Sequence, residues 1–167
     1  MHWTLIPTPD GLFRAGFSSN GLCRLLFPGQ EVPEEPPSIE AEEGDLDWEA
    51  LTSDALRAQL DGREPGELPP LDWCGGTDFQ KRVWQALQEI PAGETRSYGD
   101  LALKLGVEGG ARAVGTACGA NPIPVLVPCH RVLAADQGLG GFSGGLDWKK
   151  RLLEREGAGY RDTTVRS

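Results

Sequence analysis

Hydrophobic residues occur in short runs over the first part of the chain, and turn-forming residues separate these runs. The runs cover residues 4–7, 12–17 and 22–27. Asp10-Gly11 and Asn20-Gly21 stand between them, and Asp-Gly or Asn-Gly in such a place is a strong signal for a β-hairpin. The pattern therefore predicts three short antiparallel strands.

The pattern changes twice between residue 29 and residue 70. Residues 29–45 are acidic and rich in proline, which is typical of a loop. From Asp47 onwards apolar residues recur with a helical period until Gly62, and residues 63–70 form a linker rich in Pro and Gly. We therefore predict a small α/β domain over residues 1–72, with a short antiparallel sheet and one helix.

Helical signals dominate the rest of the chain, and a mostly α-helical domain is predicted over residues 73–167. Thr77 is suited to be the N-cap of a helix that reaches Pro91. Residues 97–100 resemble a capping box with Asp in place of the usual Glu. The chain closes with a Gly-rich turn over residues 138–145 and a helix over residues 146–156.

Two short helices in the middle of this second half suggest a particular arrangement. The helix that begins near Ser97 stops at Gly106, and residues 110–120 form a helix of small residues that carries Arg112. Two short helices joined by a tight turn containing Gly are typical of a helix-turn-helix. We predict this arrangement in its winged form, although the pattern alone is a weak indication of DNA binding.

The distribution of charge changes the interpretation of an acidic chain. The net charge is −9, but residues 1–77 carry 4 basic and 15 acidic residues, whereas residues 78–167 carry 12 basic and 10 acidic residues. Phosphate binding depends on local charge, so the second half can still present a surface for DNA.

Several classes of protein are disfavoured by composition. The chain has no apolar stretch near the roughly 18 residues of a transmembrane helix, and its N-terminus lacks the features of a signal peptide. Its four cysteines show no CxxC pair, which disfavours both a disulfide framework and a zinc motif. We therefore expect a cytoplasmic protein with reduced thiols and no membrane partner.

Cys129 is the residue with the clearest chemical potential. It ends an apolar run over residues 123–127 and is followed directly by His130. A thiolate is the reactive form of cysteine, and a nearby imidazole can take up the thiol proton. Neighbours in sequence rarely point the same way, however, and the acid that would orient His130 has to come from elsewhere. Glu156 is one candidate among several.

The segment over residues 128–132, Pro-Cys-His-Arg-Val, resembles the active-site signature of the O6-alkylguanine-DNA alkyltransferases, also called methylated-DNA–protein-cysteine methyltransferases. Further segments resemble this family in the same order and at near-matching spacing, so that the resemblance covers about residues 72–158. These segments are Arg96–Gly99, Ala111–Gly115, Asn121-Pro122, Phe142–Gly145 and Leu152–Gly157. The first half resembles the family only in outline.

The resemblance implies direct reversal of DNA damage, in which an alkyl group moves irreversibly from O6-alkylguanine in double-stranded DNA to Cys129, once per molecule. It implies a helix-turn-helix in the minor groove and a target nucleotide that is rotated out of the stack. The implied catalytic residues are Cys129, His130, Glu156, Tyr98 and Asn121. The implied DNA-binding residues are Ser97, Tyr98, Arg112, Ala113, Gly115 and Thr116. The implied pocket for the base is formed by Val127, Pro128, Ser143 and Gly144.

Some alternatives remain open at the level of sequence. Taken singly, these residue types more often have structural roles. Tyr98 would then be a packed aromatic and Arg112 a solvated charge, while Asn121 would be a helix cap and Glu156 a surface acid. A non-catalytic sensor of alkyl lesions is the main rival, although such a protein lacks the reactive cysteine. No cofactor is implied, and a structural zinc is unlikely because only His2, Cys23 and Cys74 could hold it. We expect a monomer. The range of alkyl groups and activity on O4-alkylthymine are left open.

Overall fold

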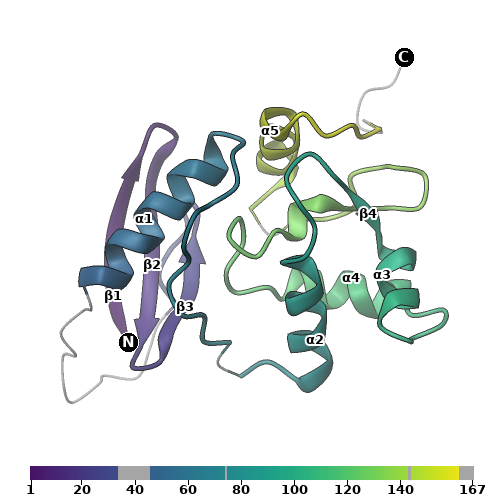
Figure 1. Cartoon of the computed structure of the whole chain (residues 1–167), viewed down its shortest axis with the longest axis horizontal. Helices are drawn as coiled ribbons and strands as arrows, with labels where there is room; N and C mark the ends of the chain where they lie inside the picture. The colour runs from purple at the N-terminus through teal and green to yellow at the C-terminus, as the bar shows by residue number, and fades with distance from the viewer. Residues whose placement is uncertain (34–45, 74, 143, 162–167) are drawn as a thin grey trace.

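The chain forms a three-stranded sheet with one covering helix, followed by a group of helices with a second, very small sheet (Figure 1). The computed structural model describes residues 1–33, 46–73, 75–142 and 144–161. In chain order the elements are β1 (His2–Thr8), β2 (Gly11–Ser18), β3 (Gly21–Leu26), α1 (Leu46–Leu60), α2 (Asp78–Leu87), β4 (Arg96–Ser97), α3 (Tyr98–Lys104), α4 (Ala111–Gly119), a 3₁₀ turn (Cys129–Arg131), β5 (Val132–Leu133) and α5 (Leu146–Glu156).

The first sheet confirms the three strands expected from the apolar runs. Its order is β1-β2-β3, and both pairs are antiparallel. Residues 70–72 lie along the outer side of β3, where Leu22 N donates to Pro70 O at 2.8 Å and Asp72 N donates to Leu22 O at 2.8 Å. Gly21 has φ +149°, and a Cβ there would lie 2.3 Å from Pro70 O, so this turn requires glycine.

The sheet is buried on one face and open on the other. Phe13, Ala15 and Phe17 of β2 point into the core, and α1 lies across this part of the molecule (Figure 1). Leu5 and Leu12 on the opposite face are 56% and 53% exposed. Antiparallel sheets often have one solvated face, which explains the alternation seen in the sequence.

The helices of the second half begin where the capping signals place them. Thr77 and Ser97 each form a complete capping box, with Gln80 and Asp100 as the respective reciprocal partners. Two orphan backbone N–H groups are thereby satisfied at each helix start. In the interior, the indole nitrogen of Trp84 donates to Ala117 O at 2.9 Å and so ties α2 to α4.

The second sheet consists of β4 and β5, which pair in parallel over two residues each. This pairing brings the start of α3, at Tyr98, close to the segment that follows Cys129. The connection between α3 and α4 is short, and these two helices pack against each other. The winged form of the helix-turn-helix stays a prediction.

The two halves of the chain share one hydrophobic core and are also joined by polar contacts. The Phe27 ring at the end of β3 lies 5.0 Å from that of Trp148 and 5.7 Å from that of Phe142. Arg155 on α5 donates to both carboxylate oxygens of Asp10, each at 2.8 Å, and to Leu60 O at 2.9 Å. The expected boundary at residue 72 stays a prediction.

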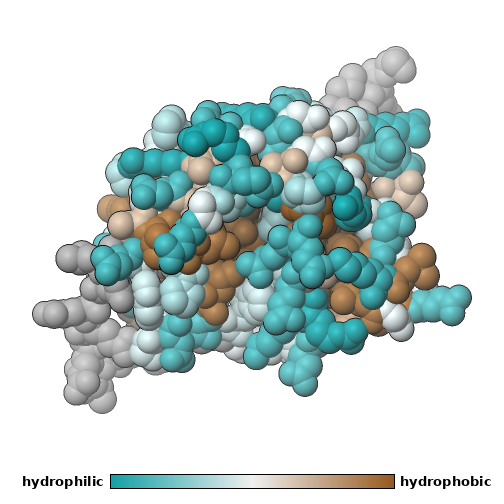
Figure 2. Space-filling model, viewed as in Figure 1, coloured by the Kyte–Doolittle hydropathy of each residue, from teal (hydrophilic) through white to brown (hydrophobic). Residues whose placement is uncertain are grey.

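Hydrophilic residues cover most of the face shown in Figure 2, interrupted by apolar patches. Leu103 is 68% exposed on α3, although Leu101 on the same helix is buried. Among the described residues there is no helix with the length and apolar character needed to cross a membrane.

Candidate active site

Cys129 lies in the wall of a cavity of about 780 Å³. The apolar run that precedes it is buried, and Cys129 itself begins the 3₁₀ turn and is 4% exposed. Five of the expected site residues contribute to the cavity wall, namely Tyr98, Arg112, Gly115, Thr116 and Cys129. All residues that line it fall between positions 98 and 142, so the cavity belongs to the second half of the chain.

Asn121 holds the segment that carries Cys129. Its side-chain nitrogen donates to Val127 O at 2.8 Å, and its side-chain oxygen accepts from Ile123 N at 3.0 Å. Cys129 N donates to the same Val127 oxygen at 2.8 Å. One carbonyl therefore receives hydrogen bonds from both residues. In the same segment Val125 has φ +73°, which is unusual for a β-branched residue and marks local backbone strain.

His130, Glu156 and Arg131 form a buried network behind Cys129. Nε2 of His130 lies 2.5 Å from Oε1 of Glu156, and the side chains are 0% and 1% exposed. Arg131 donates to both oxygens of Glu156, at 2.9 and 3.1 Å, and to Ile90 O at 2.6 Å. Because a carboxylate only accepts, Nε2 of His130 carries the proton and Nδ1 is left with its lone pair. Nδ1 is buried and has no hydrogen-bond partner among the described residues.

The charges in this network decide the protonation of its members. Burial lowers the pKa of His130 because it disfavours the charged imidazolium; Glu156 acts to raise this pKa, while the positive charges of Arg131 and Lys149 lower it further. Burial acts to raise the pKa of Glu156, but hydrogen bonds from His130 and Arg131 bring it below its ordinary value. His130 is therefore neutral and Glu156 ionised near neutral pH, which is the state needed for a base.

The pKa of the Cys129 thiol is raised by burial, and two neighbours oppose this effect. A hydrogen bond from Asn121 and the positive charge of Lys149 both favour the thiolate. A buried thiol of this kind stays protonated until a base removes its proton.

Lys149 is a residue of this site that the sequence did not single out. It lies on α5 with 0% exposure, and its ammonium donates to Val132 O at 2.7 Å, to Leu139 O and to Gly141 O at 3.3 Å. Burial lowers its pKa to about 8. In the sequence it is one of several polar residues on a helix, and no local signal distinguishes it from Lys150. Arg131, the partner of Glu156, was also named only as part of the motif.

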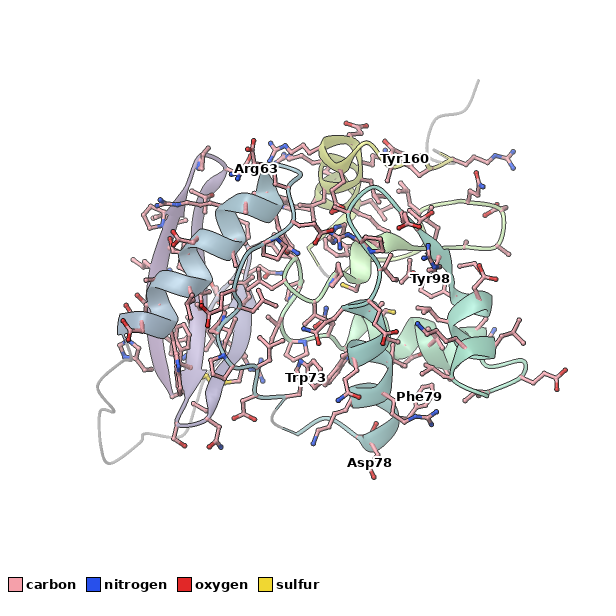
Figure 3. All side chains as sticks on the ribbon, in the orientation of Figure 1. Arg63, Trp73, Asp78, Phe79, Tyr98 and Tyr160 are labelled. Atoms are coloured by element: carbon pink, nitrogen blue, oxygen red, sulfur yellow. The ribbon has the colours of Figure 1, made fainter. Side chains whose placement is uncertain are left out.

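Tyr98 lies at the junction of β4 and α3, on the side of the molecule away from the three-stranded sheet (Figure 3). Its hydroxyl oxygen lies 2.8 Å from the position that a Cβ of Gly140 would occupy, and Gly140 has φ +65°. The Lys149 ammonium is 5.9 Å from the centre of its ring. Burial raises the pKa of Tyr98 to about 12, and the negative charge of ionised Cys118 and Cys129 adds to this. The phenol thus stays protonated and can donate.

The expected DNA-binding residues lie at and around the mouth of the cavity. Arg112, Ala113 and Thr116 are exposed on α4, and Ser97 caps α3. Ala113 and Ser97 are outside the cavity wall, whereas Arg112, Gly115 and Thr116 belong to it. Thr116 Oγ1 donates to Arg112 O at 3.0 Å within the helix.

The expected pocket residues are only partly brought to the cavity. Val127 and Pro128 are buried behind Cys129, and neither they nor Gly144 belong to its wall. Ser143 lies outside the described residues. The wall is instead completed by residues that were not expected, among them Cys118, Ala134, Ala135, Gly141 and Phe142.

Of the three residues considered for zinc, the structure describes His2 and Cys23. His2 contacts Glu49 at 2.7 Å, and Cys23 lies against Met1. Cys74 lies outside the described residues. No group of three potential metal ligands occurs among the residues described.

Comparisons with known proteins agree with this site. Residues 78–158 match the family model described as "6-O-methylguanine DNA methyltransferase, DNA binding domain". The methylated-DNA–protein-cysteine methyltransferase of Methanosarcina acetivorans is 40% identical over 163 residues, which cover 95% of this chain and 99% of the relative. The protein of the same name from Mycobacterium leprae is 55% identical over 103 residues, which cover 59% of this chain and 62% of the relative.

A solved structure is similar over almost the whole chain. The crystal structure of Mycobacterium tuberculosis OGT in complex with DNA has a TM-score of 0.78 and 40% identity, and covers 94% of this chain and 93% of that chain. The fold and the site thus define a protein with a buried cysteine in the wall of a cavity, next to a buried His–Glu–Arg network. The chain belongs to the methylated-DNA–protein-cysteine methyltransferase family.

Proposed function

We propose that this protein repairs double-stranded DNA by direct reversal, transferring an alkyl group from O6-alkylguanine to Cys129. The observation that carries the proposal is the position of Cys129, in the wall of a cavity of about 780 Å³ and next to a buried His130–Glu156 pair. The family relationship supports the choice of substrate, since the relatives are named for transfer from methylated DNA to a protein cysteine.

The first chemical step removes the thiol proton. His130 accepts this proton at Nδ1 through a water molecule, while Glu156 holds Nε2–H and stabilises the imidazolium that forms. Arg131 keeps Glu156 ionised, and Lys149 stabilises the thiolate of Cys129 by its charge. The low pKa of His130 ensures that the imidazole is free to accept a proton at neutral pH.

The second step is the displacement itself. The thiolate attacks the alkyl carbon, a carbon–sulfur bond forms, and the bond between that carbon and O6 breaks. The electron pair of the broken bond passes to the guanine ring, which takes up a proton from the Tyr98 hydroxyl. Tyr98 is suited to this role because its raised pKa keeps the phenol protonated. The product is a thioether of the protein, so each molecule reacts once and no cofactor takes part.

Access to the cavity requires that the target nucleotide leave the stack, at a cost of a few kcal/mol. We place α3 and α4 on the DNA as a winged helix-turn-helix in the minor groove, with the small residues of α4 against the sugar-phosphate walls. Arg112, exposed at the cavity mouth, would fill the gap left by the extruded base. Residues 73–167 would then form the functional domain and residues 1–72 a supporting one.

Mass spectrometry of the protein after incubation with a duplex that contains one O6-methylguanine tests this proposal. The expected result is a gain of one methyl group on the peptide that contains Cys129, with no more than one group per molecule. The Cys129→Ala variant should gain none. If the protein binds the duplex and no cysteine is methylated, the protein is a sensor of lesions, and the roles given to His130 and Glu156 are wrong.

A further inference from the structure

The cavity contains a second thiol that the proposed transfer does not use. Cys118, on the last turn of α4, lines the same cavity as Cys129 and is 6% exposed. Both side chains are free thiols. Cys23, the other cysteine among the described residues, lies in β3 next to Met1 and takes no part in the cavity wall.

The backbone brings these two cysteines together through one residue. Asn121 N donates to Cys118 O at 3.2 Å, and the Asn121 side chain donates to Val127 O, which also accepts from Cys129 N. The 10 residues between the cysteines are thus folded so that both ends of this segment line the cavity.

The electrostatic environment couples the two thiols as well. Burial raises the pKa of Cys118 to about 12, and the negative charge of ionised Cys129 adds to this effect. The Lys149 ammonium acts on both groups in the opposite direction. A thiol as weakly acidic as Cys118 is a poor acceptor of alkyl groups, but it can still react with an oxidised sulfur placed beside it.

We propose that Cys118 and Cys129 are a dithiol pair that hydrogen peroxide or an organic hydroperoxide converts into a disulfide, so that the cavity is also a site of reversible oxidation. Disulfide formation requires the two Cβ atoms to come within about 3.5–4.5 Å of each other. Cys118 and Cys129 line the same cavity and are joined by the Asn121 turn, so the proposed bond requires rotation of the two side chains and movement of this turn to bring the Cβ atoms to that separation.

The chemistry balances with peroxide as the only co-reactant. The Cys129 thiolate attacks one peroxide oxygen, the O–O bond breaks, and sulfenic acid and water (or an alcohol) form. Cys118 sulfur then attacks the Cys129 sulfur, the S–O bond breaks, and the hydroxide leaves as water with the Cys118 proton. His130 can hold the proton of Cys129 in the first step.

The consequence is protection of the acceptor. A disulfide stops the further oxidation of Cys129 to sulfinic acid, which thiols do not reverse, and a reductant restores both thiols. Only this loss and recovery of repair rests on the proposed function, because formation of the disulfide can be measured without any DNA.

The experiment treats the full chain with hydrogen peroxide and reads out intact and peptide masses without reduction. We expect the loss of two hydrogen atoms, mapped to a peptide pair that joins Cys118 to Cys129. The Cys23→Ala/Cys74→Ala double variant, which retains only the proposed pair, should give the same product. Dithiothreitol should restore the original mass and, with methylated duplex, the methyl transfer of the untreated protein.

The matched variant is Cys118→Ser, with Cys118→Ala as a second one should the first fail to fold. In this variant, peroxide should add two oxygen atoms to Cys129, because no partner thiol is present. Dithiothreitol should then fail to restore the methyl transfer that the treatment abolished. Each variant is compared with its own untreated sample. The proposal is overturned if the unaltered chain forms no disulfide between these residues, or if it gives the same products and the same recovery as Cys118→Ser.

Discussion

The carbonyl oxygen of Val127 is the point at which the backbone aligns Cys129. It receives one hydrogen bond from the Asn121 side chain and one from Cys129 N, both 2.8 Å long. The position of the thiol is therefore set by the main chain and by the side-chain amide of Asn121. Its reactivity depends on the buried groups around it. At this scale the proposed chemistry depends on His130 and Lys149, and burial lowers the pKa of both side chains.

The burial of neutral His130 makes the stability of the fold depend on pH. Below pH of about 6.5 the unfolded chain binds a proton at this residue, whereas the folded chain, with its lowered pKa, does not. The free energy of unfolding should thus fall as pH falls from 7.5 to 5.5, by up to about 1.4 kcal/mol per pH unit. Denaturant titrations at several pH values measure this slope.

The control for that slope is the His130→Asn variant. His2 is the only other histidine and remains in both proteins, and Glu156 begins to contribute only below about pH 4.3. The variant should therefore show a smaller dependence on pH between 7.5 and 5.5. Equal slopes in the two proteins would contradict the lowered pKa of His130.

Lys149 should matter for both stability and transfer. Lys149→Met keeps the length of the side chain and removes the ammonium, which leaves the carbonyls of Val132, Leu139 and Gly141 without this donor. A buried acceptor that loses its partner costs about 1–3 kcal/mol. We expect destabilisation of at least that size by chemical denaturation, together with slower methyl transfer because the thiolate loses a nearby positive charge.

The neighbouring Lys150→Met is the matched control, because Lys150 is only half-buried on the same helix and donates to none of these three carbonyls. Both measurements should change much less in this variant. If the two variants behave alike, Lys149 has no special part in holding the cavity wall.

At the scale of elements, local signals were sufficient for the strands and helix starts and insufficient for the site. Thr77 and Ser97 could be assigned as caps because a cap depends on three or four consecutive residues. The same holds for the hairpins, which are set by Gly11 and Gly21 and their neighbours. Leu103 shows the limit, since its apolar character alone does not determine on which side of a short helix it lies.

The resemblance named the site residues segment by segment, including Glu156, but it did not name every partner that these residues have. Cys129 and His130 stand in one short signature. The ion pair of Arg131 with Glu156 joins residues 25 positions apart. Lys149 and Cys118 are brought to the cavity by the packing of α5 and α4. Such partners depend on how elements pack, and no pattern within one element reveals them.

The loop between β5 and α5 contains a residue whose replacement should stabilise the protein. Gln137 has φ +64° and is exposed. An L-residue in the left-handed region costs about 1–2 kcal/mol, and glycine there costs about 0.5–1 kcal/mol in the entropy of the unfolded chain. Gln137→Gly should therefore raise the free energy of unfolding by about 0.5–1 kcal/mol, measured by chemical denaturation.

Gln137→Ala provides the comparison, because it removes the same side chain and retains a Cβ. Alanine should give no such gain. A gain of the same size in both variants would show that the amide side chain, rather than the backbone conformation, is unfavourable at this position.

At the scale of the whole molecule, ion pairs join Asp10 of the first hairpin to the last helix, with Arg155 at 2.8 Å and with Arg151 at 3.9 Å. Hydrogen bonds from Arg155 lower the pKa of Asp10, and the two side chains are 35% and 13% exposed. Because the pair is partly solvated, we expect a coupling of no more than about 1 kcal/mol, decreasing with salt. A double-mutant cycle with Asp10→Asn and Arg155→Met, at low and high ionic strength, measures it.

That coupling should fall with ionic strength while each protein keeps a cooperative unfolding transition. A coupling that is independent of salt would mean that the two residues act through packing. In that case the two hydrogen bonds between Arg155 and Asp10 fix the relative position of the two side chains but add little electrostatic energy to the stability of the fold.

Through the contacts of Phe27 and Arg155, the first half of the chain helps to hold the site in place. Phe27 supports the cavity wall at Phe142, and Arg155 fixes the last turn of α5 next to Glu156. The first half of the chain thus supports the site on two sides, although none of its described residues lines the cavity. Because both halves share one hydrophobic core, heating that loosens the sheet would release both supports at once, and the cavity would lose its shape as the whole chain unfolds.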